Sequence, residues 1–116
     1  DEISLSASTQ IGELRDGHIT RYTVSPADFG MQQRSDYRAL QVESPQQSLE
    51  LVKKALSYQD EAAGDIVALN AGAAIYAANL CDDLPAGVAR AQEILKSGAA
   101  LEKLQQLAEM TQGFAK

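Results

Sequence analysis

The 116-residue sequence has little cysteine, no tryptophan and fewer basic than acidic residues. A single cysteine, Cys81, excludes an internal disulfide framework and fits a reducing compartment. The 10 Lys and Arg against 16 Asp and Glu give a net charge of −6, which argues against a general nucleic-acid binder and against attachment to an anionic membrane surface. The first residues have no basic stretch followed by an apolar run, so we expect no secretory signal.

Motifs that would make a complete active site are also missing. The sequence has no glycine-rich phosphate loop, no Ser/His/Asp set and no CxxC pair. His18 stands beside a turn and is expected to be exposed, and Cys81 is expected to act as a small hydrophobic residue rather than a nucleophile. Four arginines are expected to form a solvated face rather than a binding patch: Arg15, Arg21, Arg34 and Arg38.

The residues that are present fit one small domain or a piece of a larger one. A hydrophobic content of 45% excludes an ordinary disordered tail. The sequence changes character near Ser44, from mixed and turn-rich to helical and rich in Ala and Leu. We therefore predict a β-rich part over residues 1–43 and a helical part over residues 44–112.

The first part predicts a strand and a hairpin. Ile3–Ala7 is β-like, and Thr9–Val24 is predicted to fold back on itself at Asp16-Gly17, a dipeptide typical of type I′ turns. The turn would set three cross-strand pairs: Leu14 with Ile19, Ile11 with Tyr22, and Thr9 with Val24. These apolar residues do not share one face, so we expect both faces of the hairpin to be partly covered.

Four helices are predicted in the second part. Ser44 is expected to cap the first, which ends near Tyr58, and Asp65 to cap a second that runs to about Cys81. Asp83 is expected to cap the third, and a fourth follows Ser97-Gly98. The expected buried stripes are Leu84, Val88, Ala91 and Leu95 on the third helix, and Leu101, Leu104, Leu107 and Ala108 on the fourth.

The second helix is expected to lie at the centre of the domain. It has no charged residue from Ile66 to Cys81, but it is shorter than the roughly 20 residues that a bilayer span needs. Small residues at 71–74 would let another backbone approach closely. Asn70 and Asn79 interrupt the apolar run, and buried amides need partners, either neighbouring backbone or a ligand.

Two adjacent acidic pairs are candidates for a metal site. Asp82-Asp83 is better explained as the cap of the third helix. Asp1 and Glu2 offer two hard oxygen ligands of the kind that suits Mg²⁺ beside substrate phosphates. Adjacent strand residues point to opposite faces, so both can bind one ion only where the backbone bends. From spacing alone, a solvated terminal pair explains Asp1 and Glu2 better than a metal site does.

Several short segments follow one another in a specific order. They are Asp1-Glu2-Ile3-Ser4, Glu13-Leu14-Arg15-Asp16-Gly17, Leu69-Asn70-Ala71-Gly72-Ala73-Ala74 with Tyr76, Gly87-Val88, and Ser97-Gly98-Ala99. As a series they resemble the C-terminal part of the anthranilate phosphoribosyltransferase family, over nearly the whole chain. The sequence departs from the family where many members carry Gly-Gly and Glu-Asn, at Val42-Glu43 and Gln47-Ser48, and where Ala86 replaces a frequent Glu.

The resemblance implies an α/β fold. Residues 1–116 would be the C-terminal portion of a nucleoside-phosphorylase-type large domain, a strand plus a β-hairpin and then four helices. The family's N-terminal helical domain and its phosphate loop would lie upstream and are absent from this sequence.

The resemblance also implies a reaction. The family transfers a phosphoribosyl group from phosphoribosyl diphosphate to anthranilate, with release of diphosphate, in tryptophan biosynthesis. It implies a cytoplasmic homodimeric parent, no nucleic-acid or membrane partner, and Asp1 and Glu2 as ligands of Mg²⁺. Without the phosphate loop, this chain alone is predicted to be inactive.

Two other interpretations remain open from the sequence. One is another member of the nucleoside-phosphorylase superfamily, such as a pyrimidine nucleoside phosphorylase. The other is a free-standing, non-catalytic helical interaction module with a β-hairpin.

Overall fold

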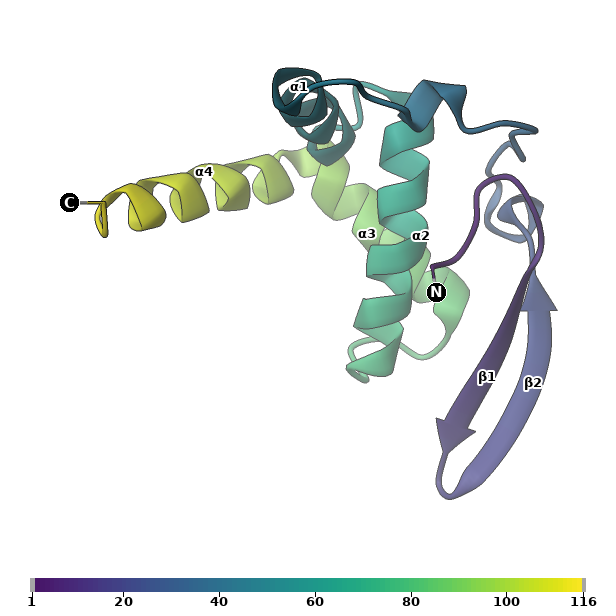
Figure 1. The fold of residues 1–116 in the computed structure, drawn as a ribbon. Helices are drawn as coiled ribbons and strands as arrows, with labels where there is room; N and C mark the ends of the chain where they lie inside the picture. Colours follow the sequence, from purple (N-terminus) through teal and green to yellow (C-terminus); the bar gives the residue numbers. More distant parts are fainter. Residues whose placement is uncertain (1, 116) are drawn as a thin grey trace.

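A computed structural model describes residues 2–115 as a hairpin followed by helices (Figure 1). The strands and 3₁₀ helices are β1 (Thr9–Arg15), β2 (His18–Val24), η1 (Pro26–Phe29) and η2 (Arg38–Leu40). The α-helices are α1 (Pro45–Leu56), α2 (Glu61–Ala77), α3 (Leu84–Ser97) and α4 (Ala99–Gln112). The predicted order of a hairpin and then four helices is confirmed, as is the α/β class. Within residues 2–115, no helix combines the length and apolar character that a membrane crossing requires.

The hairpin forms in the predicted register. Leu14 pairs with Ile19, and Asp16 and Gly17 have φ angles of 50° and 78°, the left-handed values that a type I′ turn needs at both positions. The Ile11–Tyr22 pair is half-buried, but Leu14 and Ile19 are each 72% exposed. The expectation that both faces are covered is therefore wrong for the part of the chain that the structure describes, because the hairpin extends beyond the helices (Figure 1).

The predicted strand at Ile3–Ala7 does not form in the described residues. Residues 2–4 are irregular and residues 5–7 form a bend, because the hairpin supplies no ladder partner for them. The segment is nevertheless fixed, since the side chains of Ile3 and Leu5 are 6% and 1% exposed in the core. Its alternating burial, but not its hydrogen bonding, is that of a strand.

Two of the three predicted helix caps are confirmed, and the third is wrong. The hydroxyl of Ser44 accepts from the N–H of Gln47, and the carboxylate of Asp83 accepts from the N–H of Ala86. The cap of α2 is Asp60, whose carboxylate accepts from the N–H of Ala63 at 2.9 Å. Residues 61–64, which precede the predicted cap, thus form the first turn of the helix, and Asp65 lies buried inside it.

The core is built around a close contact between α2 and α3. A Cβ atom added to Gly72 would lie 2.5 Å from the Cα of Val88, and one added to Gly87 would overlap the carbonyl oxygen of Gly72. The predicted close approach at residues 71–74 is therefore confirmed. The expected stripe of α3 is also buried, at 1–7% exposure: Leu84, Val88, Ala91 and Leu95.

Helix α4 extends away from the other helices (Figure 1). It has no buried residue, and Leu107 of its predicted inward stripe is 54% exposed. The stripe is therefore wrong as a core face of residues 2–115, although Leu101 and Leu104 are half-buried near the start of the helix. Its apolar residues line a shallow hollow with Leu56 and Ala100.

Candidate functional site

The predicted metal pair lies at the edge of the described structure. Asp1 falls outside the described residues, and Glu2 is exposed. Among residues 2–115 there is no cluster of three or more His, Cys, Asp or Glu that could hold an ion by themselves. The donor chemistry still fits Mg²⁺, which is commonly held through one or two carboxylates together with substrate phosphates and waters.

Directly after Glu2, the backbone is held by the side chain of Asn70 on α2. The N–H of Ile3 donates to Asn70 Oδ1 at 2.8 Å, and Asn70 Nδ2 donates to the carbonyl of Ile3 at 3.1 Å. The same Nδ2 donates to the carbonyl of Ile66, one turn earlier on α2, at 2.9 Å. The amide therefore bonds both backbone groups of one residue, as a neighbouring strand residue would.

Further side chains fix the segment after Ile3. The N–H of Ser4 donates to the hydroxyl of Thr9 at 2.9 Å, and the carbonyl of Leu5 accepts from the backbone N–H of Arg34 at 3.0 Å. The Ser6 hydroxyl donates to Tyr37 Oη at 2.6 Å. The hydrogen bonds that Tyr37 makes with the hydroxyls of Ser4 and Ser6 lower the pKa of its phenol, and the bond with Ser4 is the larger cause. The acidic pair thus precedes a backbone that is held in place without a sheet.

The other candidates from the sequence have structural roles. Asp83 caps α3, as expected, and His18 is exposed with Nδ1 3.0 Å from the carbonyl oxygen of Asp16. Cys81 is half-buried and its thiol donates to the carbonyl of Asp83 at 3.3 Å. Asn79 lies in the turn that follows α2 and has a φ of 58°, which is a left-handed conformation.

The four arginines do not form one patch. The guanidinium of Arg15 lies 5.1 Å from the centre of the Tyr76 ring, beside a hollow between the hairpin and α2. Arg34 pairs with Glu61 at 3.1 Å and Arg38 with Asp36 at 3.3 Å. Arg34 and Arg38 are thus each paired with a carboxylate, and half-buried Arg34 is not part of the solvated face that the sequence predicted.

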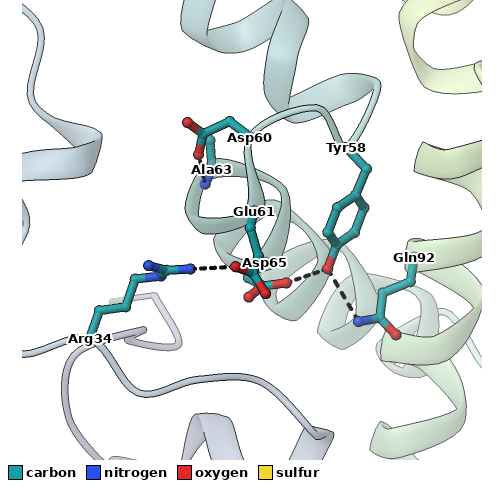
Figure 2. A network of polar contacts seen from close by, with 7 residues as sticks. All are labelled: Arg34, Tyr58, Asp60, Glu61, Ala63, Asp65 and Gln92. Carbon is teal, nitrogen blue, oxygen red and sulfur yellow. Dashed lines mark hydrogen bonds and ion pairs between the residues drawn. The ribbon is translucent and has the colours of Figure 1, made fainter.

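A buried polar network that the sequence did not predict lies between α1, α2 and α3 (Figure 2). The Tyr58 hydroxyl donates to a carboxylate oxygen of Asp65 and accepts from Gln92 Nε2, the latter at 3.2 Å. Asp65 is 4% exposed. The Tyr58 ring lies against Gly64, where an added Cβ would be 2.8 Å from a ring carbon, and under the Lys96 ammonium at 5.1 Å.

Burial controls the ionisation of this network. Desolvation raises the pKa of Asp65, and the hydrogen bond from Tyr58 opposes that rise. Desolvation, followed by the bond to Asp65, raises the pKa of Tyr58 to about 12. The only hint of this network in the sequence is a tyrosine and an aspartate two helical turns apart, which is too common a pattern to identify it.

The chain is similar in sequence to known proteins. The sequence model described as "Glycosyl transferase family, a/b domain" matches residues 1–101. The chain is 51% identical over 115 residues to the anthranilate phosphoribosyltransferase of Acidovorax sp. (strain JS42), 49% over 115 to that of Polaromonas sp. (strain JS666 / ATCC BAA-500), and 46% over 114 to that of Cupriavidus necator. These alignments cover 98–99% of this chain and 33% of each relative.

The chain therefore spans about a third of the length of the curated relatives that it matches. The family match covers the acidic pair, the hairpin, α1 to α3 and the first turn of α4. We conclude that this chain belongs to the glycosyl transferase family and carries a portion of its α/β domain.

Proposed function

We propose that residues 1–116 form the C-terminal portion of an anthranilate phosphoribosyltransferase, which acts in tryptophan biosynthesis in the cytoplasm with Mg²⁺ as its metal. The observation that carries this proposal is an identity of 46–51% to enzymes of that name over 98–99% of the chain. The match to the family's α/β domain supports the proposal further. The single cysteine, which is free, is consistent with the proposed cytoplasmic location. The homodimeric state of the parent remains a prediction.

In this proposal the amine of anthranilate forms a bond to C1 of phosphoribosyl diphosphate. The bond from C1 to the diphosphate oxygen breaks, diphosphate leaves with the electron pair, and the new amine loses a proton. Bound Mg²⁺ would neutralise charge on the diphosphate. The part of this chain is to present the carboxylates of Asp1 and Glu2 at the start of the fixed segment, in reach of that cation.

The acidic pair can be tested in the full-length protein. Asp1→Ala with Glu2→Ala should greatly raise the Mg²⁺ concentration needed for half-maximal transfer, because two of its ligands are lost. The fluorescence of phosphoribosyl-anthranilate measures the product. A matched control is Asp82→Ala with Asp83→Ser, which removes another adjacent acidic pair but keeps a residue that can cap α3. An unchanged Mg²⁺ dependence in the first variant would refute the role of the pair.

The incomplete site can be tested with the 116-residue chain alone. It should produce no phosphoribosyl-anthranilate under conditions in which the full-length protein does, because this sequence has no glycine-rich phosphate loop. Robust turnover by the isolated chain would contradict this prediction. A full-length protein that binds phosphoribosyl diphosphate but transfers it to a different acceptor would overturn the proposed substrate.

A further inference from the structure

The amide of Asn70 has a position that the fold does not explain by itself. It lies on a helix whose buried residues are alanine, glycine and leucine apart from Asp65, and it makes one acceptor and two donor bonds to backbone groups of Ile3 and Ile66. Burying an amide costs free energy unless its bonds are made. An apolar residue at this position would avoid the requirement, so the amide is best explained by what it holds.

The group that Asn70 holds is the peptide that joins Glu2 to Ile3. The N–H of Ile3 belongs to this peptide, whose planarity ties that N–H rigidly to the Cα atom of Glu2. A bond of 2.8 Å from the Ile3 N–H to Asn70 Oδ1 therefore fixes the direction in which the backbone of Glu2 leaves the core. The second bond, at 3.1 Å to the Ile3 carbonyl, prevents rotation about the first.

The orientation of Asn70 is itself fixed from within α2. Nδ2 bonds the Ile66 carbonyl at 2.9 Å, and this bond determines which side of the amide carries the acceptor. The side chain of Ile3 is 6% exposed, so the anchored residue cannot slide along the helix without leaving the core. Helix, amide and peptide thus form one rigid unit that ends at Glu2.

We propose that Asn70 is the positioning residue of the metal site, which sets the Glu2 carboxylate toward the cation that accompanies phosphoribosyl diphosphate. This inference rests on the proposed function. Mutation of a residue that hydrogen-bonds to a metal ligand and orients it commonly lowers metal affinity by about 10- to 100-fold. Asn70 touches neither substrate nor metal in this proposal and acts through the backbone of Glu2.

The test uses the full-length protein with Asn70→Ala and Asn70→Ser. A serine hydroxyl can bond the carbonyl four residues earlier on a helix, which is Ile66, but it is too short to replace the amide at Ile3. The control is Gln92→Ala, which removes a half-buried amide that bonds Tyr58 instead. If Asn70→Ala fails to fold, Asn70→Ser still tests the proposal, because it keeps its own hydroxyl bonded.

Three measurements separate positioning from general stability. Binding of Mn²⁺ in the presence of phosphoribosyl diphosphate, measured by electron paramagnetic resonance, should weaken about tenfold or more in both Asn70 variants. The Mg²⁺ concentration for half-maximal transfer should rise by the same factor, with little change in the KM for anthranilate. Hydrogen exchange of the peptide that covers residues 1–8 should accelerate. The Gln92→Ala control should change none of the three.

The outcomes are distinguishable. Asn70 variants with faster exchange over residues 1–8 but wild-type metal affinity would overturn the positioning role and leave the proposed function standing. A wild-type protein that binds no Mn²⁺ with phosphoribosyl diphosphate would overturn the proposed function, and the positioning role with it. Equal losses in metal affinity and in KM for anthranilate would show a general structural defect and would also overturn the positioning role.

Discussion

Replacement of Tyr58 by phenylalanine should destabilise α2 by an amount that depends on pH. The substitution removes the hydroxyl alone, because the ring would keep its place against Gly64 and under Lys96. The acceptor of the lost bond is Asp65, which is 4% exposed, so water cannot readily donate a hydrogen bond in its place. Hydrogen bonds to charged groups are worth about 1.5–3 kcal/mol, so we expect a loss in the upper part of that range at neutral pH.

The loss should be smaller in acid. Burial raises the pKa of Asp65, so this carboxyl becomes protonated at a higher pH than an exposed aspartate. Once it is protonated, the bond from Tyr58 joins two neutral groups and is worth about 0.5–1.5 kcal/mol. Because the folded-state pKa is raised, the contribution of Asp65 to stability is complete below its unfolded pKa and is lost as the pH rises through the folded pKa. The Asp65→Asn variant should therefore be least stable relative to the wild type in acid, and the difference in stability should be smaller at neutral pH.

Native-state hydrogen exchange of the α2 amides is the suitable assay. The relatives that this chain matches are about three times as long, and for proteins of that size a single unfolding free energy is poorly defined, whereas local opening can be read residue by residue. A loss of about 2–3 kcal/mol corresponds to opening roughly 30- to 150-fold more often. An equal loss at acid and neutral pH would refute the reasoning, as would an undiminished effect of Tyr58→Phe in an Asp65→Asn background.

Two further predictions follow from the helices. Gly72→Ala should destabilise the protein by about 1–3 kcal/mol in spite of the better helix propensity of alanine, because its Cβ would lie 2.5 Å from the backbone of Val88. Thermal unfolding measures this loss. The control is Gly12→Ala, which has no atom within 4 Å of its added Cβ and should leave the unfolding midpoint nearly unchanged. Asp83→Ala should cost about 1 kcal/mol by losing the cap on the Ala86 N–H, while Asp83→Ser should retain most of it. Equal midpoints for the two Asp83 variants would contradict the capping role.

Local chemistry explains the parts of the fold that the sequence predicted well. Asp16-Gly17 needs left-handed φ angles at two successive positions, and that requirement alone determines the register of the whole hairpin. Ser44 and Asp83 cap their helices through bonds that span three residues. The stripe of α3 was also readable, because its four apolar positions recur at the helical period.

Tertiary contacts explain the parts that were missed. The sequence predicts that Asp65 caps the second helix, whereas in the structure α2 begins at Glu61 and the missing side chain of Gly64 makes room for the Tyr58 ring. Asp65 is therefore a buried partner of Tyr58 instead of a cap. The apolar stripe of α4 has the right period, but residues 2–115 leave Leu107 largely uncovered.

In the candidate site, too, the sequence predicts local features but not tertiary contacts. Carboxylates at positions 1 and 2 are visible in the sequence, although only the resemblance to a family makes them more than a solvated pair. The sequence shows Asn70 as a polar residue within an apolar run, but it does not identify Ile3 as the partner of that amide. No local pattern connects it with Ile3, since the two residues are 67 positions apart.

That separation has a consequence for folding. Besides local bonds such as that from Ser4 to Thr9, the segment after Glu2 obtains bonds from α2 and from the loop at Arg34, neither of which is near it in sequence. Closing so long a chain loop is entropically unfavourable until both ends have something to bind, so we expect the segment to dock after the helices have assembled. Under the proposed function, Glu2 would then reach its final orientation only at the end of folding.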